Sequence, residues 1–503
     1  MTGEPLQAVQ IAQQHTLDDY AAVAHLAPAV HELRAEAAGV LPRLAGRTVW
    51  MVSSTAAGGG VAEMLPPIVA LLRDLGARTE WMVIGTEEPE FFVLTKHLHN
   101  LIHGSGTPQL DGGAREMFEC VNRASAEALR PRLRDGDVLV VHDPQPLPMA
   151  RMLRESVKLA AVWRCHIGLD EENEATRAAW DFLMPYLDAY DHAVFSAPEY
   201  IPHGLAGRAT VIAPGIDPLA PKNMELSVRQ TVQVLCNSGL TVPPGPLLHP
   251  PFASQARRLL ADGTFAPASA LEDIGMLTRP IVTQISRWDR LKGWLPLMHA
   301  FAALKRSVYE GDPNVDPLHR RRLDLVRLVL AGPEPAAIQD DPEALEVLDD
   351  LSGAYARLHP AVQDDVALIA LPMASREENA LMVNAIQRSS TLVVQNSTRE
   401  GFGLTIAEAM WKRIPVLSNS RACGPRQQLR DGLDGRLIAN PEDVDELQRA
   451  IDAALADSEA RQQWGRSAQR RVHELFMVIA QLRRWGQLLA TLPSLTDLPA
   501  TGR

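Results

Sequence analysis

Cysteine is scarce in this chain, because only four of its 503 residues are cysteines and these stand far apart. Their spacing fits neither a disulfide framework nor a set of zinc ligands. We therefore expect reduced, mostly buried thiols in a cytoplasmic protein. The four residues are Cys120, Cys165, Cys236 and Cys423.

Long apolar runs are absent as well, so we expect no membrane-spanning helix. The segment from Met1 to Pro5 lacks the basic and apolar parts of a signal peptide, and we expect none. Positive charge is in deficit: 49 lysines and arginines face 61 aspartates and glutamates, which gives a formal net charge of −12. This balance disfavours nucleic acid and anionic membranes as partners. An anionic substrate must therefore meet a local cluster of basic residues.

Several nucleotide-binding and hydrolase motifs are missing. The chain has no G-x-G-x-x-G fingerprint, no P-loop lysine and no G-x-S-x-G elbow, which disfavours NAD, ATP and serine-hydrolase chemistry. Asp135-Gly136-Asp137 resembles a metal-binding Asp-x-Asp, but it directly precedes an expected strand and is better explained as a turn. No cluster has metal-ligand spacing, so we expect no essential metal and no cofactor.

Apolar strands that alternate with helical segments are present throughout, which is typical of doubly wound parallel sheets. The predicted strands are 48–52, 80–84, 138–141, 159–163, 193–195 and 210–212 in a first series, and 281–285, 327–330, 366–371, 392–395 and 414–417 in a second. The chain is also too long for one ordinary core. This α/β pattern predicts two Rossmann-like lobes, whose ligands bind beyond the carboxyl ends of the strands.

The expected boundaries follow from this division. Residues 1–217 form the first lobe and residues 280–473 the second, with a proline-rich crossover or insertion at 218–279. Within the first lobe, residues 8–45 have helical periodicity. In the second lobe, the polar stretch 332–365 is expected to be a surface excursion.

The most specific stretch is a strand, a glycine turn and a helix that together contain two glutamates. Residues 399–412 have the sequence REGFGLTIAEAMWK. Gly401 and Gly403 let the backbone approach a ligand, and the helix expected from Leu404 directs N–H groups at a phosphate. Glu400 and Glu408 can accept hydrogen bonds from the hydroxyls of a sugar or a ribose. Two glutamates at this spacing are common on solvated helix faces, but the whole string predicts a sugar-nucleotide site.

Basic residues follow the first strand of the second lobe, in Ser286–Gly293. Arg287 and Lys292 would lie where a diphosphate binds and could neutralise the charge on a departing nucleoside diphosphate. A solvated basic turn is the alternative for this segment taken alone. Three glycines follow the first strand of the first lobe, namely Gly58, Gly59 and Gly60. They suit close approach by a phosphate or a sugar, and a plain tight turn is the alternative.

Polar residues also end two strands of the first lobe. His142 and Asp143 follow the strand at 138–141, and His166 follows the strand at 159–163. These positions tend to face the ligand side of a parallel sheet. His166 could therefore contact a donor sugar, and Asp143 could accept a hydrogen bond from an acceptor hydroxyl. A satisfied structural histidine is the alternative interpretation.

Taken together, these motifs resemble the trehalose glycosyltransferring synthase branch of the retaining family-four glycosyltransferases, which have the GT-B fold. The strings that carry the resemblance are 54–63, 142–146, 163–167, 216–219, 383–388 and 400–408. The resemblance implies metal-independent transfer of glucose from a nucleoside diphosphate glucose to free glucose, with an α,α-1,1 linkage and retained configuration. It also implies an active site in the cleft between the lobes, and a C-terminal helix at 474–503 that joins the first lobe.

The same resemblance assigns roles to the candidate residues. Arg287 and Lys292 match the basic pair that stabilises the leaving diphosphate, while Glu400 would contact the transferred sugar. The implied catalytic residues are Arg287, Lys292, Glu400 and His166. The implied donor-binding residues are Gly58, Gly59, Gly60, Gly401, Phe402, Gly403, Leu404 and Glu408, of which Glu408 would bind the ribose. The implied acceptor-binding residues are His142 and Asp143.

Two features depart from the family pattern. Family members usually carry paired glycines where this chain has Ala422-Cys423-Gly424-Pro425, and the segment 224–278 is longer than expected. Three other functions stay open: a retaining trehalose phosphorylase, a transferase with another sugar acceptor, and a non-catalytic sugar-nucleotide-binding protein. The expected partners are a nucleoside diphosphate sugar and a small sugar acceptor, without nucleic acid or membrane, and the chain could form a homodimer.

Overall fold

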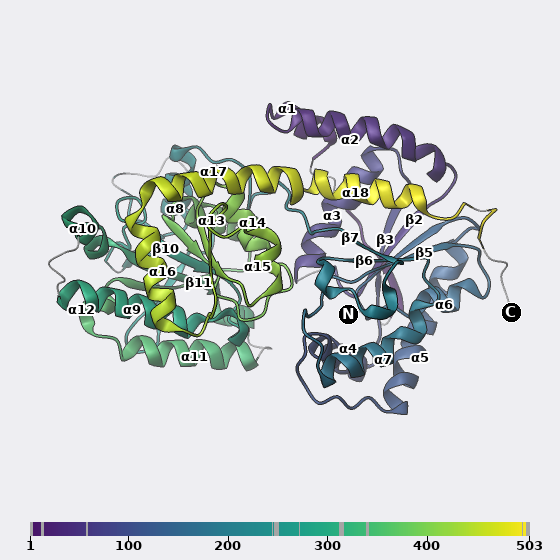
Figure 1. Cartoon of the computed structure of the whole chain (residues 1–503), viewed down its shortest axis with the longest axis horizontal. Helices are drawn as coiled ribbons and strands as arrows, with labels where there is room; N and C mark the ends of the chain where they lie inside the picture. The colour runs from purple at the N-terminus through teal and green to yellow at the C-terminus, as the bar shows by residue number, and fades with distance from the viewer. Residues whose placement is uncertain are drawn as a thin grey trace. The chain divides into compact units, whose positions relative to one another are not determined.

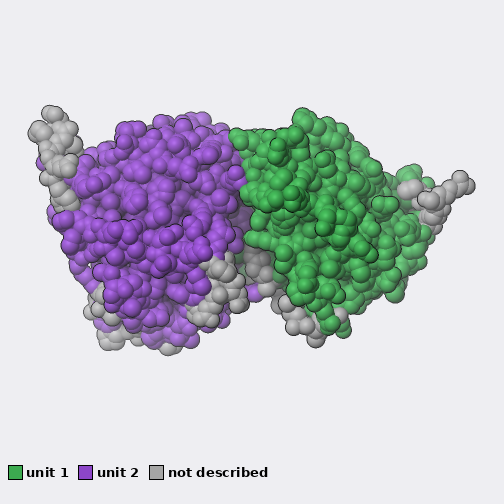
Figure 2. Space-filling view, turned by 90° about the horizontal axis from the view of Figure 1, so that it is seen from below, with its two compact units in different colours: residues 1–217, 475–503 green, residues 218–474 purple. Residues whose placement is uncertain are grey.

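The chain divides into two compact units, which Figure 2 shows in separate colours. Unit 1 comprises Met1–Asp217 and Leu475–Arg503, and unit 2 comprises Pro218–Glu474. The computed structural model describes residues 4–11, 15–56, 59–243, 245, 251–270, 272–310, 316–338, 342–494 and 496–498. None of the described helices is long and apolar enough to cross a membrane.

Unit 1 is built on a seven-stranded sheet (Figure 1) in the order β1-β3-β2-β4-β5-β6-β7. The strands are β1 (Leu6–Ala8), β2 (Val49–Ser53), β3 (Thr79–Ile84), β4 (Val138–His142), β5 (Ala160–Arg164), β6 (His192–Phe195) and β7 (Ala209–Val211). Every residue of β2, β4 and β5 is buried, as expected for central strands covered on both faces. The pairs are parallel except that β1 runs antiparallel to β3, so the sheet is mixed at one edge.

The helices of unit 1 come from both ends of the chain. The helices are α1 (Leu17–Ala22), α2 (Ala27–Val40), α3 (Gly59–Asp74), α4 (Pro89–Ile102), α5 (Gly112–Leu129), α6 (Met149–Arg154), α7 (Glu174–Leu187) and α18 (Val478–Thr491). The helical prediction for residues 8–45 is confirmed in α1 and α2, but Ala8 belongs to β1 and Pro28 lies at the start of a second, separate helix. Helix α18 lies against α2 (Figure 1), where Arg483 pairs with Glu32 and Glu36.

Unit 2 has an eight-stranded sheet in the order β15-β14-β13-β10-β11-β12-β8-β9. The strands are β8 (Arg257–Leu259), β9 (Phe265–Pro267), β10 (Ile281–Ile285), β11 (Arg327–Pro333), β12 (Val366–Leu371), β13 (Leu392–Val394), β14 (Val416–Asn419) and β15 (Arg436–Ile438). Strands β10 to β15 pair in parallel, while β8 and β9 add an antiparallel edge. The proline-rich segment is therefore more than a crossover, because it supplies β8, β9 and a helix to this unit.

The core of unit 2 lies on both faces of its sheet. Alternate residues of β11 point to opposite faces, since Leu328 and Leu330 join one buried cluster and Val329 and Ala331 join the other. The helices are α8 (Val228–Asn237), α9 (Trp294–Glu310), α10 (Pro317–Leu325), α11 (Pro342–Ala356), α12 (Pro360–Gln363), α13 (Arg376–Arg388), α14 (Leu404–Trp411), α15 (Cys423–Gln428), α16 (Val444–Ala456) and α17 (Ser458–Leu475). The expected surface excursion at 332–365 is wrong, because α11 contributes Leu351 and its neighbours to the core.

Candidate active site

A glycine loop joins β13 to α14, as the sequence pattern predicted. Gly403 caps α14 with a left-handed φ of 83°, and a Cβ at this position would lie 3.0 Å from Glu400 Cγ. Gly424, on α15, packs closely against the same loop, because a Cβ at this position would lie 2.4 Å from Phe402 O. The Gly424 N–H donates to Glu400 O at 3.1 Å. The glycine that this chain retains beside Cys423 is thus the one that the loop requires.

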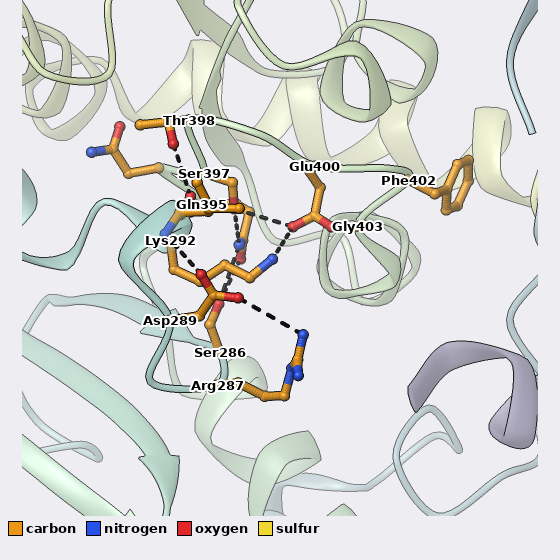
Figure 3. Close-up of polar contacts among 12 residues, drawn as sticks. Ser286, Arg287, Asp289, Lys292, Gln395, Ser397, Thr398, Glu400, Phe402 and Gly403 are labelled. Carbon is orange, nitrogen blue, oxygen red and sulfur yellow. Dashed lines mark hydrogen bonds and ion pairs between the residues drawn. The ribbon is translucent and has the colours of Figure 1, made fainter. Parts of the chain in front are cut away.

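Lys292 and Glu400 form the centre of the site in unit 2 (Figure 3). Lys292 Nζ lies 2.7 Å from Glu400 Oε2, and the two side chains are 14% and 15% exposed. Ser397 Oγ donates to the same carboxylate oxygen at 3.1 Å. Gln395 Nε2 donates to Ser397 Oγ at 2.8 Å and to Ser286 Oγ at 3.2 Å, which links the loop to the end of β10. Residues that lie far apart in the sequence therefore converge at the carboxyl ends of β10 and β13.

The backbone of Lys292 is fixed from β10. Gln284 Nε2 donates to Lys292 O at 2.8 Å, and Gln284 Oε1 accepts from Asn396 N–H at 3.0 Å. Gly293 follows with a left-handed φ of 61°, where a Cβ would lie 2.2 Å from Asn396 O. The turn that carries Lys292 is therefore tied to the strand and the loop that carry the rest of the site.

The Arg287 side chain is more exposed and more weakly paired than that of Lys292. Its side chain is 76% exposed and forms a loose ion pair, with 3.9 Å between Arg287 Nη2 and Asp289 Oδ2 (Figure 3). Arg290, which the sequence left without a role, pairs instead with Glu346 and Asp350 on α11. The site thus offers one anchored ammonium and one guanidinium with room to meet an anion.

Glu408 lies one turn into α14 and is buried. Its Oε1 is 3.8 Å from Lys222 Nζ. Lys412, on the next turn, is also buried, and burial lowers its pKa to about 7 against the opposing effect of the Glu408 charge. Sequence reasoning missed both lysines. Lys222 precedes the second lobe's first strand by a long stretch, so no local pattern could associate it with Glu408.

Phe402 and the first-lobe glycines are further residues predicted to bind the donor. Figure 3 shows the Phe402 ring away from Lys292 and Glu400, and the residue is buried. Gly58 lies outside the described residues, while Gly59 and Gly60 begin α3. Their donor-binding role stays a prediction.

In unit 1, the ends of β4 and β5 bring three predicted residues together. His142 Nδ1 lies 3.2 Å from His166 Nε2, and the two rings stack at 14°. Asp143 Oδ1 accepts from His166 N–H at 2.8 Å, and Asp143 has a left-handed φ of 63°, which is uncommon for a residue with a Cβ. Such strain often marks a functional position.

The charges in this cluster are set by burial. Burial lowers the pKa of His142 to about 3 and that of His166 well below its usual range, with a further lowering by the Arg164 guanidinium. Burial raises the pKa of Asp143 to about 6. Both histidines are therefore neutral near pH 7. Among the described residues, His142 Nε2 and His166 Nδ1 have no hydrogen-bond partner, which leaves each ring one nitrogen to bond with a ligand or water.

Two sequence families match parts of the chain. The family described as "Trehalose synthase, N-terminal domain" matches residues 51–202, and "Glycosyl transferases group 1" matches residues 375–471. The trehalose synthase of Rubrobacter xylanophilus is 32% identical over 92% of this chain and 95% of its own length. The trehalose synthase of Pyrococcus horikoshii is 31% identical over 90% of this chain and 91% of its own length. The trehalose phosphorylase of Pleurotus sajor-caju is 25% identical over 76% of this chain but only 50% of its own length.

Solved structures share the fold. The trehalose-6-phosphate synthase OtsA superposes with a TM-score of 0.62 and 17% identity, covering 89% of this chain and 100% of that one. The alpha,alpha-trehalose-phosphate synthase (UDP-forming) from Burkholderia xenovorans, in complex with glucose-6-phosphate, superposes with a TM-score of 0.60 and 18% identity. The match covers 88% of this chain and 100% of that one. At this identity the likeness concerns the fold alone, and it confirms the two-lobe GT-B fold that the sequence predicted.

Proposed function

The chain belongs to the trehalose synthase family of glycosyltransferases, and we propose that it transfers glucose from a nucleoside diphosphate glucose to free glucose. The product is α,α-1,1-linked trehalose, formed with retention of the anomeric configuration. The observation that carries this proposal is the cationic pair at the carboxyl ends of β10 and β13, where Lys292 is held against Glu400 and Arg287 is exposed.

In the proposed reaction, the bond between the anomeric carbon of glucose and the phosphate oxygen breaks. The acceptor hydroxyl oxygen bonds to that carbon on the same face, and its proton passes to the leaving phosphate. Arg287 and Lys292 stabilise the charge that develops on the diphosphate. Side chains thereby take the part that a metal ion takes in other transferases, and we propose that no metal is required.

The two glutamates have separate parts in this proposal. Glu400 contacts the transferred glucose, because its carboxylate lies beside the cation proposed to meet the leaving group. Glu408 binds the ribose hydroxyls from α14. Gly401, Phe402 and Leu404 form the loop and helix start that the diphosphate approaches.

The acceptor is proposed to bind in unit 1, at His142 and Asp143, with His166 directed at the donor sugar. Two neutral imidazoles and a carboxylate can hydrogen-bond a neutral sugar. The cation beside them is Arg164, and it is fully buried, so it is badly placed to meet a phosphate. Free glucose is therefore the proposed acceptor, and glucose 6-phosphate should be a poor one. The cytoplasmic location stays a prediction from the four scattered cysteines, none of which forms a disulfide.

The proposal is tested by incubating the purified chain with glucose and a panel of ADP-, UDP- and GDP-glucose, and measuring released nucleoside diphosphate. Release should require glucose and should follow one preferred donor. A parallel reaction with trehalose and inorganic phosphate tests for a phosphorylase. Glucose 1-phosphate formed there, with no nucleotide released in the first reaction, would replace the transferase proposal by the phosphorylase one. Donor binding without any release would favour a non-catalytic protein.

A further inference from the structure

Glu408 has a cationic neighbour that the proposed function does not use. Its side chain is 5% exposed, and that of Lys222, 3.8 Å away, is 26% exposed. A carboxylate buried to this degree is costly unless a positive charge or hydrogen-bond donors accompany it. Lys222 supplies that charge from outside the helix, and its own side chain is partly exposed.

The segment that carries Lys222 is fastened to two helices of unit 2. Asn384 Nδ2, on α13, donates to Pro221 O and to Met224 O, both at 2.9 Å. Trp411 Nε1, on α14, donates to Asn223 O at 3.2 Å. The backbone on both sides of Lys222 is therefore fixed relative to the helix that carries Glu408, so the ammonium and the carboxylate are positioned as a unit.

Lys412 is a less suitable candidate for contact with a ligand. Its ammonium is buried and donates to three oxygens: Gln387 Oε1 at 2.7 Å, Glu408 O at 3.2 Å and Asn223 Oδ1 at 3.3 Å. An ammonium has three donors, so these contacts use all of them. Lys412 thus holds the Lys222 segment against α14, and Lys222 is the cation near the surface.

The two side chains together match a vicinal diol. Each ribose hydroxyl donates one hydrogen bond and also accepts, whereas a carboxylate can only accept and an ammonium can only donate. Glu408 alone offers the hydroxyl oxygens no donor. An adjacent ammonium completes the match.

We propose that Lys222 is a donor-specificity residue, which donates to a ribose hydroxyl oxygen of the sugar nucleotide while Glu408 accepts from the diol. This inference rests on the proposed function, since it concerns the ribose of the same donor. It predicts that the protein distinguishes a ribonucleotide from its 2′-deoxy counterpart, and that this preference needs Lys222 in addition to Glu408.

The test is calorimetric titration of the full chain with ADP, UDP and GDP, then with the 2′-deoxy form of whichever binds best. The wild type should bind the ribonucleotide about tenfold more tightly, the effect of losing one hydrogen bond to a charged group. Lys222→Met should weaken ribonucleotide binding by about tenfold and leave deoxynucleotide binding within about threefold, so the preference largely disappears. In turnover, KM for the NDP-glucose should rise by about tenfold while kcat changes by less than about threefold.

Four further variants separate this role from a structural one. Lys222→Gln is a second neutral variant, and Lys222→Arg should restore part of the preference because it keeps a charged donor. Arg229→Ala is the matched control: Arg229 is exposed at the start of α8 and forms no ion pair with any described residue, so its loss should change nothing. In the double variant with Glu408→Gln, the losses should be less than additive, because both residues act on one diol.

Each outcome has a definite meaning. An unchanged ribonucleotide preference in Lys222→Met and Lys222→Gln would overturn the inference and leave the proposed function standing. Equal weakening of both nucleotides would also overturn it, because that result assigns Lys222 to the phosphates or to the fold. If the wild type binds no nucleoside diphosphate at all, this inference and the donor assignment both fail.

Discussion

Removing Lys292 and removing Arg287 should have the same effect on rate but different effects on stability. Both cations are proposed to meet the departing diphosphate, and loss of one such contact costs about 10²–10³ in kcat. The structure separates them in the folded protein, because Lys292 is anchored to Glu400 at 2.7 Å while Arg287 is 76% exposed with one ion pair at 3.9 Å.

The magnitudes follow from these contacts. In Lys292→Met, the Glu400 carboxylate keeps Ser397 as a donor but loses a charge-assisted partner in a mostly buried position. Such a loss costs about 2 kcal/mol, which lies between the values for an exposed and a fully buried pair. In Arg287→Ala, an exposed side chain with a loose ion pair is lost, and stability should change by less than about 0.5 kcal/mol.

The assay pairs nucleotide release under saturating glucose with urea unfolding of the same preparations. Arg287→Ala serves as the matched control for Lys292→Met, since each removes one cation from the same turn. Near-normal turnover in both variants would refute the leaving-group role. Equal loss of stability in both would refute the reasoning from burial.

Other consequences can be checked in the same way. Glu400→Gln should chiefly lower the rate of transfer, while Glu408→Gln should chiefly weaken binding of free nucleoside diphosphate; equal nucleotide affinity in wild type and Glu408→Gln would contradict the ribose assignment. Activity should survive EDTA, and a reproducible loss that Mg²⁺ or Mn²⁺ restores would show that a metal is needed. The free energy of unfolding should decrease as the pH is lowered below about 6.5. The reason is that the pKa of buried His142 is lowered to about 3, so only the unfolded state takes up its proton in this range. Between pH 7.5 and 5.5, protonation of this histidine in the unfolded state lowers the free energy of unfolding by about 1.4 kcal/mol. Asp143 opposes this loss in part, because its raised pKa favours the folded state as the pH falls. Urea unfolding of His142→Gln at both pH values should show a smaller decline than the wild type, and an equal decline would assign the effect elsewhere.

The sequence was most informative where a feature is local. Continuous apolar runs gave β2, β4 and β5, because buried parallel strands need no polar alternation. The glycine turn before α14 was equally visible, since Gly401 and Gly403 stand directly before the apolar helix. The short strand β1 was missed, because its three residues have no periodicity of their own and depend on pairing with β3.

In the candidate site, too, the sequence did not show contacts between residues from different segments. Arg287 and Lys292 stand close together in the sequence and looked equivalent, but only the fold reveals that one is anchored to Glu400. Lys222 could not be associated with Glu408 from sequence, because the two meet only after the segment before α8 packs on α13 and α14. Contacts between distant segments carry no local signal.

The identity of the product tests the proposed function most directly. NDP-glucose and free glucose should give a disaccharide whose NMR spectrum has a single anomeric signal, because α,α-1,1-linked trehalose is symmetric. Glucose 6-phosphate, offered in place of glucose, should react poorly, since Arg164 beside His142 and Asp143 is fully buried. Exclusive use of glucose 6-phosphate, or of a sugar other than glucose, would contradict the central claim, while the single signal from glucose would support it.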